Sequence, residues 1–222
     1  MLRMTHLEHD KVELLKRVRQ LEEQVDELEH HLIHDKLTGL KTRAFFEEEV
    51  GTYLDVIAKQ EELLKHGSSE RKERFGFRNL SVIFFDIDHF KSVNDNHGHD
   101  VGDMVLKEVA LVVERSLRAG DTVARWGGEE IVVSLLGADE QDAGVKAEEI
   151  RSLIAKHKFS EVPNLKVTVS AGVSSAERGL SIQKLVKRAD LALYEAKESG
   201  RDKVVAYSEM MKLNPPVLTV QI

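Results

Sequence analysis

The chain has 222 residues, of which 41% are hydrophobic and 32% are charged, and its formal net charge is −7. This length accommodates one ordinary domain with an appendage, and the composition excludes a chain that is disordered throughout. No apolar stretch approaches the roughly 20 residues that span a bilayer, so we expect a cytoplasmic protein without a membrane partner. The acidic balance argues against a nonspecific nucleic-acid binder. The chain has no cysteine, so oxygen or imidazole must hold any metal.

The first 34 residues carry apolar side chains at heptad spacing and contain neither Gly nor Pro. Their a and d positions are Met4, Leu7, Lys11, Leu14, Val18, Leu21, Val25, Leu28 and Leu32. Eight of these nine positions are apolar, which is typical of a coiled-coil seam. Arg3 and Arg17 precede Glu8 and Glu22 by five positions, the offset that pairs charges across a parallel dimer. We therefore expect residues 1–34 to form a parallel homodimeric coiled coil. The alternative is one amphipathic helix packed on its own domain.

The remainder of the chain alternates helical and strand patterns. The predicted elements are a helix over 42–65, an exposed loop over 66–78, a strand over 80–86, a helix over 101–117, strands over 122–126 and 131–136, a helix over 142–157, a strand over 165–173, a helix over 182–199 and an edge strand over 203–207. Pro215 and Pro216 mark an irregular tail over 209–222. We accordingly expect one domain over 35–208 between the coiled coil and the tail.

The β-α-β-β-α-β order predicts an α+β fold of the ferredoxin-like type, an antiparallel sheet with helices on one face. In this connectivity the hairpin after the second strand turns at the end where the first strand finishes. Asp86 and Asp88 should therefore meet the turn Gly127-Gly-Glu-Glu130. Carboxylates gathered in this way suit hard divalent cations such as Mg²⁺, which also bind substrate phosphates. The pattern indicates metal-dependent phosphoryl or nucleotidyl chemistry.

Four separated motifs narrow this hypothesis. They are Asp35-Lys-Leu-Thr-Gly-Leu40, the string from Phe85 to Asp103, Arg125-Trp-Gly-Gly-Glu-Glu-Ile131, and the helix from Ala189 to Arg201. In this order they resemble the GGDEF family of diguanylate cyclases, with the palm fold of nucleotidyl cyclases. The signature reads GGEEI, since Ile131 replaces the usual Phe. The resemblance implies condensation of two GTP molecules into cyclic di-GMP, with loss of two pyrophosphates, in a homodimer.

The resemblance also assigns roles to residues. It implies two Mg²⁺ ions per site, with Mn²⁺ as an alternative, held by Asp86, the Ile87 carbonyl, Glu129 and Glu130. Glu129 and Lys91 would act in catalysis. The residues implied in substrate binding are His89, Phe90, Asn94, His99, Asp103, Lys197 and Arg201. Without the surrounding motifs, Asn94 reads as a helix C-cap, Asp103 as a first-turn acid, and Lys197 and Arg201 as a solvated helix end.

Arg118-Ala-Gly-Asp121 lies nine residues before Gly127, at the spacing of the family's product-inhibition motif. Arg118 and Asp121 would then bind cyclic di-GMP, whereas an Arg–Asp pair capping a strand is the alternative. We expect the coil to relay a signal from an upstream sensor that lies outside this chain. A noncatalytic GTP or cyclic di-GMP receptor remains the rival hypothesis, and a nucleotidyl cyclase with another substrate is a second one.

Overall fold

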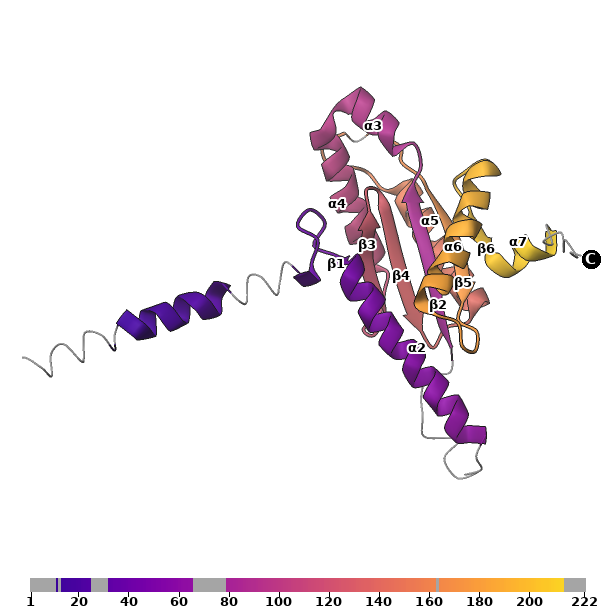
Figure 1. Cartoon of the computed structure of the whole chain (residues 1–222). Coiled ribbons are helices and arrows are strands. Elements are labelled where there is room, and N and C mark those ends of the chain that lie inside the picture. Colours follow the sequence, from indigo (N-terminus) through magenta and orange to yellow (C-terminus); the bar gives the residue numbers. More distant parts are fainter. Residues whose placement is uncertain (1–10, 12, 25–31, 66–78, 163, 214–222) are drawn as a thin grey trace, which may run out of the picture.

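The computed structural model describes residues 11, 13–24, 32–65, 79–162 and 164–213. Its principal helices are α2 (Arg43–Lys65), α3 (Phe90–His97), α4 (His99–Arg115), α5 (Glu140–Lys156), α6 (Ile182–Glu198) and α7 (Tyr207–Leu213). Its strands are β1 (Lys41–Thr42), β2 (Leu80–Ile87), β3 (Thr122–Gly127), β4 (Glu130–Leu136), β5 (Val169–Ser175) and β6 (Val204–Ala206). Figure 1 shows the strands forming one twisted sheet, with α3 beyond one end.

The six strands lie in the order β1-β3-β4-β2-β5-β6. Within the four central strands, each hydrogen-bonded pair is antiparallel, which confirms the predicted β-α-β-β-α-β core. The edge strands β1 and β6 pair in parallel with β3 and β5. The sheet is therefore mixed rather than antiparallel throughout. The edge strands β1 and β6 are only two and three residues long, too short for the sequence to indicate their direction.

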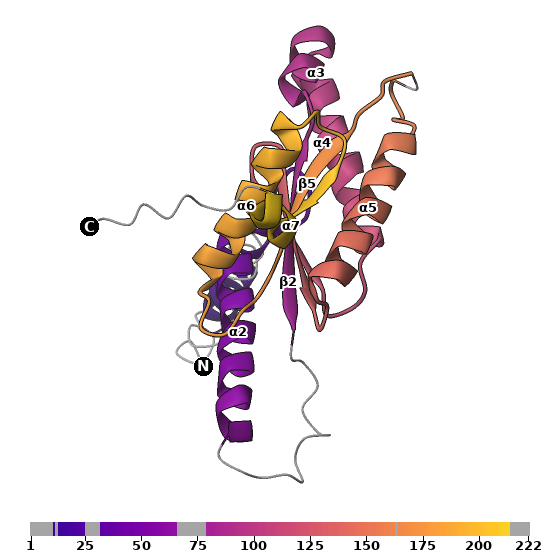
Figure 2. The same ribbon diagram turned by 90° about the vertical axis from the view of Figure 1, so that its right-hand side faces the viewer.

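Helices cover both faces of the sheet, so the expectation of helices on one face was wrong. Figure 2 shows α2 and α6 on one side of the sheet and α4 and α5 on the other. The central strand β2 is buried along all eight residues. Ile83 and Phe85 belong to the core beneath α4 and α5, whereas Val82 and Phe84 belong to the core beneath α2 and α6. A strand that is apolar on both faces needs a helical layer on each.

Three other segments differ from the sequence prediction. The strand predicted from 165 begins at Val169, because its partner β2 ends at Ile87, the residue opposite Val169. The short helix α3 precedes α4, and α4 begins at His99 rather than at 101. The helix α7 occupies 207–213, part of the segment expected to be an irregular tail.

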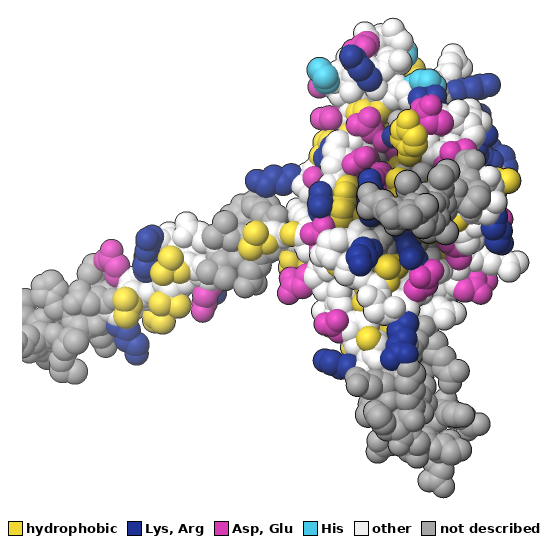
Figure 3. Space-filling view, turned by 45° about the vertical axis from the view of Figure 1, so that its right-hand side comes forward, with side chains coloured by type: hydrophobic (Ala, Val, Ile, Leu, Met, Phe, Trp, Pro, Cys, Tyr) yellow, Lys and Arg dark blue, Asp and Glu magenta, His cyan; other side chains and the backbone are white. Residues whose placement is uncertain are grey.

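Part of the predicted coiled coil is described. Residues 13–24 are helical, and the seam residues Leu14, Val18 and Leu21 are 67%, 44% and 46% exposed. Figure 3 shows hydrophobic side chains grouped along this helix. The seam positions Met4, Leu7, Val25 and Leu28 lie outside the described residues, as does the 66–78 loop. No helix in the described ranges is long and apolar enough to cross a membrane.

Candidate active site

The turn between β3 and β4 brings acidic residues to the end of β2, as the connectivity predicted. Asp86 lies directly opposite Glu130 in the antiparallel register of β2 and β4. Gly128 has a φ of +43°, a conformation that favours glycine, and a register shift follows Arg125. Next to the turn, Ile131 is buried at 1% exposure and pairs with Phe85, so an aliphatic side chain fits this core position.

Several carboxylates lie at this end of the sheet, and the nearest cation, Lys197, does not neutralise all of their negative charge. Lys197 Nζ lies 2.7 Å from Asp86 Oδ2. Burial raises the pKa of Asp86, and the nearby charges of Glu129 and Asp88 act in the same direction, against Lys197. Burial and the Asp86 charge likewise raise the pKa of Glu130. Both carboxylates would gain from an additional cation.

This donor set fits a divalent metal in its chemistry. Asp86 and Glu130 offer neighbouring carboxylate oxygens, and Ile87 ends β2 beside them. Within the described ranges, no three Asp, Glu, His or Cys side chains are grouped closely enough to hold a metal ion. Lys197 is paired with Asp86 instead, so metal binding would require that contact to loosen.

The helix α3 begins immediately beyond the acidic cluster. His89, the residue before it, has a φ of +57°, and its carbonyl accepts hydrogen bonds from the N–H groups of Ser92 and Val93. The first N–H groups of a helix lack partners within the helix and attract anions. Phe90 is buried and anchors this end, while Lys91 is exposed.

Asn94 and Asp103, the expected guanine-binding residues, are brought together where α3 meets α4. Asn94 lies inside α3 rather than at its end, and its Oδ1 packs against Gly102, the residue before Asp103. Asp103 and His99 are both exposed on α4. These side chains can therefore meet a ligand from solvent, and Asn94 already approaches the α4 backbone.

Arg201 lies beyond the end of α6, one turn after Lys197, in a segment with unusual backbone angles. Arg201 and Asp202 have φ values of +62° and +47°. Asp88, 5% exposed, accepts a hydrogen bond from the Asp202 N–H at 3.0 Å. The predicted phosphate-binding residues are therefore tied to the acidic end of β2.

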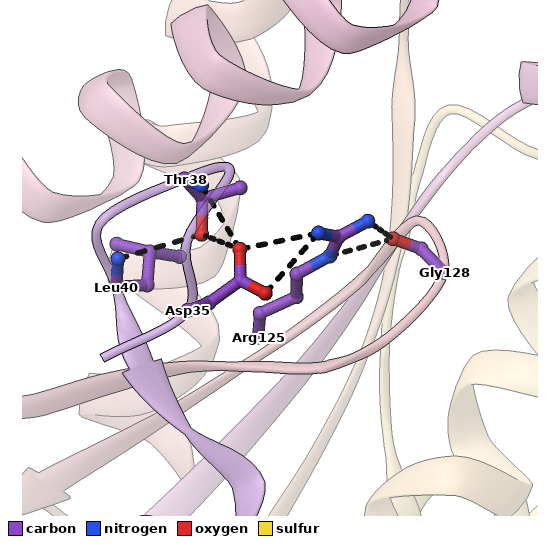
Figure 4. Close-up of polar contacts among 5 residues, drawn as sticks. All are labelled: Asp35, Thr38, Leu40, Arg125 and Gly128. Atoms are coloured by element: carbon purple, nitrogen blue, oxygen red, sulfur yellow. Dashed lines mark hydrogen bonds and ion pairs between the residues drawn. The ribbon is translucent and has the colours of Figure 1, made fainter. Parts of the chain in front are cut away.

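A network that the sequence analysis missed holds the β3–β4 turn in place. Arg125 donates two hydrogen bonds to the carbonyl of Gly128, at 2.9 and 2.8 Å, and pairs with Asp35 at 3.1 Å (Figure 4). Asp35 also accepts hydrogen bonds from the N–H and hydroxyl of Thr38. Ninety positions separate Asp35 from Arg125, so no local pattern signals the contact.

Arg118 and Asp121 lie away from the acidic cluster, before the start of β3. Arg118 Nε lies 3.4 Å from Asp121 Oδ1, and Arg118 Nη2 donates to the Leu136 carbonyl at 2.7 Å. Asp121 is largely covered, whereas the Arg118 side chain is 68% exposed. Both residues line a pocket of about 440 Å³ that also includes Asp142 and Lys146.

Comparison with known proteins agrees with this arrangement. The model of a family described as "Diguanylate cyclase, GGDEF domain" matches residues 32–203. The chain belongs to the GGDEF family. Diguanylate cyclase A of Treponema denticola is 40% identical over 172 residues, which make up 77% of this chain and 43% of that protein. The response regulator PleD of Caulobacter vibrioides is 38% identical over 80% of this chain and 37% of its own length. The chain thus spans less than half of each of these relatives.

Solved structures of GGDEF proteins share the fold. The coiled coil and GGDEF domain of DgcB from Caulobacter crescentus, solved with c-di-GMP, matches with a TM-score of 0.74 and 29% identity, covering 90% of this chain and 98% of that one. The diguanylate cyclase SiaD of Pseudomonas aeruginosa, solved with its activator SiaC, matches with a TM-score of 0.65 and 34% identity. That match covers 92% of this chain and 76% of SiaD.

Proposed function

We propose that this GGDEF protein is a diguanylate cyclase that condenses two GTP molecules into cyclic di-GMP. The observation that carries the proposal lies beside the turn of the signature hairpin. There Lys197 contacts Asp86, and Asp86 pairs with Glu130 at the start of β4. The helix α3 begins just after β2, close to these residues. A nucleotide whose base reached Asn94 and Asp103 would therefore extend its phosphates toward Asp86, Glu130 and Lys197.

In the proposed reaction each of two facing domains holds one GTP. The 3′-oxygen of one GTP attacks the α-phosphorus of the other, and the bond to the pyrophosphate oxygen breaks as pyrophosphate leaves with the electron pair. The 3′-hydroxyl proton passes to a base, for which Glu129 is the candidate. The reciprocal attack closes the ring, so atoms and charge balance over two identical steps.

The residues around the β3–β4 turn have separate roles in binding and orienting the substrate. Lys197, Arg201 and the N–H groups of His89 and Phe90 hold the triphosphate. Lys91 stabilises the transition state, and His99 forms a wall of the base pocket. Asn94 and Asp103 recognise guanine, because a carboxylate accepts from its N1–H and amino group, a pairing that adenine cannot make. Asp86, the Ile87 carbonyl, Glu129 and Glu130 would hold Mg²⁺, which supplies neutralisation of phosphate charge.

The α4–β3 loop adds a product-binding site to this proposal. An exposed guanidinium beside a covered carboxylate offers donors to phosphate or to the guanine Hoogsteen edge, and acceptors to base N–H groups. Arg118 and Asp121 have this arrangement beside a pocket of about 440 Å³. We assign cyclic di-GMP to this pocket as a feedback inhibitor.

The proposal also includes the organisation of the chain. Residues 1–34 form the dimerising and signal-relaying coil, and 35–208 form the catalytic domain. The segment from 209, which begins within α7, forms the tail. An upstream sensor, on a longer chain or another protein, supplies the input. Figure 3 shows hydrophobic side chains grouped along the helix at 13–24, which supports a coil.

The test is chromatography of the products after the chain is incubated with GTP and Mg²⁺. We expect cyclic di-GMP, with progress curves that slow as it accumulates, and no turnover by Glu129→Gln with an unchanged thermal midpoint. Glu48→Gln, an exposed change on α2, is the control and should retain full activity. GTP binding without any product would select the noncatalytic receptor instead.

A further inference from the structure

The segment after α6 that carries Arg201 adopts a conformation that its residues do not favour on their own. Gly200, Arg201 and Asp202 have successive φ values of +116°, +62° and +47°. Non-glycine residues rarely adopt positive φ, and such backbone persists only where surrounding contacts impose it. The Arg201 N–H is held by the Ala196 carbonyl at 3.0 Å, and two further contacts hold Asp202.

The first contact comes from Asp88, two residues after Asp86. The carboxylate of Asp88 accepts a hydrogen bond from the Asp202 N–H at 3.0 Å. It also accepts hydroxyl hydrogen bonds from Thr168 and Ser170, each at 2.7 Å. Asp88 is buried and accepts hydrogen bonds from three donors, so its side chain has a well-defined position. Through the Asp202 N–H it holds the backbone of the segment against the sheet.

The second contact comes from Arg151 on α5, which packs against the sheet face opposite α6. Arg151 Nη1 contacts the carboxylate of Asp202. Glu148 orients the guanidinium with two further hydrogen bonds, from Nε at 2.7 Å and from Nη2 at 2.5 Å. The Arg151 side chain is only 18% exposed. Asp202 is thus held by its backbone N–H on one side and by its carboxylate on the other.

We propose that Arg151, together with Asp88, is a positioning residue that holds the Arg201 segment in the conformation that binds the terminal phosphates of GTP. The inference rests on the proposed function, in which Arg201 contacts those phosphates. Loss of Arg151 removes the side-chain contact of Asp202, which is then held by the Asp88 hydrogen bond alone. The segment samples negative φ more often, and Arg201 moves away from its place. Binding of GTP must then reorder the segment, so affinity falls for ligands with terminal phosphates and stays unchanged for ligands without them.

The test compares GTP with GMP on Arg151→Gln, a variant on the opposite sheet face from the acids. Calorimetry with an α,β-methylene analogue of GTP and Mg²⁺ should show about tenfold weaker binding, while the Kd of GMP changes less than twofold. In initial rates, KM for GTP should rise by a similar factor with little change in kcat, as expected for lost uniform binding. Arg151→Lys, which keeps the charge, should recover part of the loss.

Two variants complete the experiment. Arg188→Gln is the matched control, because Arg188 pairs with Glu177 at 2.8 Å and its side chain is 25% exposed, on another face of the molecule. It should bind both nucleotides as the unmodified protein does. Asp202→Asn keeps a residue that tolerates positive φ but removes the charge that Arg151 contacts, and should show a smaller loss of GTP affinity.

Unchanged GTP affinity in Arg151→Gln and Asp202→Asn overturns the inference, as does an equal loss of GTP and GMP affinity, which marks general damage. If Arg151→Gln does not fold, Asp202→Asn alone decides. Failure of the proposed function gives a different result: the unmodified protein makes no cyclic di-GMP, or Arg201→Ala binds the GTP analogue normally.

Discussion

Gly102 provides the space that Asn94 occupies at the junction of α3 and α4. A Cβ atom on Gly102 would lie 1.9 Å from Asn94 Oδ1 and 3.4 Å from Phe90 Cζ. The first separation is impossible for real atoms, so any other residue at 102 displaces the Asn94 side chain. The amide is the far end of a side chain that can rotate, so the fold can tolerate this displacement more easily than the guanine pocket can.

Gly102→Ala should therefore weaken GTP binding without destabilising the protein. Loss of the Asn94 hydrogen bonds corresponds to roughly a three- to tenfold rise in the Kd of GTP, at about 0.5–1.5 kcal/mol for a typical hydrogen bond. The thermal midpoint should not fall, because alanine favours helix more than glycine does. Calorimetry and thermal unfolding measure the two effects separately.

Gly144→Ala on α5 is the matched control, since nothing lies within 4 Å of the Cβ position there. It should raise the thermal midpoint and leave GTP affinity unchanged. A folded Gly102→Ala protein with normal affinity for GTP would contradict the role given to Asn94.

Residues in short, continuous motifs could be placed from the sequence, and those held by distant partners could not. Asp86 and Glu130 were expected to meet, because strand connectivity alone sets which ends of β2 and the hairpin coincide. Asp88 was expected near the same turn, but its role in holding Asp202 depends on a partner 114 positions away. Local patterns carry no information about such pairings.

At the scale of elements, the turn at 35–40, before β1, contacts the signature motif at 125–131. These two motifs are far apart in the sequence, so their contact could not be predicted from local patterns. Asp35 is bonded to Thr38 within the turn and to Arg125 at the start of the signature motif. Arg125 in turn holds the Gly128 carbonyl. The β3–β4 turn is therefore supported by the 35–40 turn, and Arg125 links these two parts of the domain (Figure 4).

Asp35→Asn should weaken the contact with Arg125 that supports the β3–β4 turn. The stability difference between the variant and the parent protein should depend on pH. Burial acts to raise the pKa of Asp35, but the hydrogen bonds from Thr38 and the Arg125 charge outweigh it, so the pKa is lowered. A lowered pKa in the folded state stabilises the protein above the unfolded-state pKa, and this contribution is lost as pH falls through the folded-state value. The variant should lose about 1.5–3 kcal/mol of unfolding free energy at neutral pH.

Urea denaturation at pH 7 and at progressively lower pH measures this difference, which should shrink as the Asp35 carboxylate of the parent protein is protonated. Asp55→Asn, an exposed change on α2, is the control and should show no such dependence. A constant difference at every pH would show that the charge of Asp35 is not what braces the turn. We also expect a lower kcat for Asp35→Asn, because the signature turn loses its support.

At the scale of the whole molecule, the proposed reaction requires two sites to face each other, and the N-terminal helix is the candidate for bringing them together. A coil raises the effective concentration of one domain near its twin. The exposed seam residues Leu14 and Leu21 offer the apolar surface that such a dimer would bury.

The double variant Leu14→Asp, Leu21→Asp should be monomeric and nearly inactive at low protein concentration, with activity returning as concentration rises. Analytical ultracentrifugation and initial rates over a dilution series measure both properties. Lys16→Asp with Gln20→Asp places the same side chains on the outer face of the helix and should leave a dimer. Undiminished turnover by a dilute monomer would contradict the role of the coil.

The edges of the sheet limit how copies of this protein can associate. β1 has two residues and β6 has three, so neither edge offers a second chain a row of unpaired backbone groups long enough to extend. If two copies bring their domains face to face, as proposed, an open strand edge would allow them to join permanently. With both edges this short, the encounter that the proposed reaction requires would have to use helices and loops, and strand pairing between copies would not turn it into an aggregate.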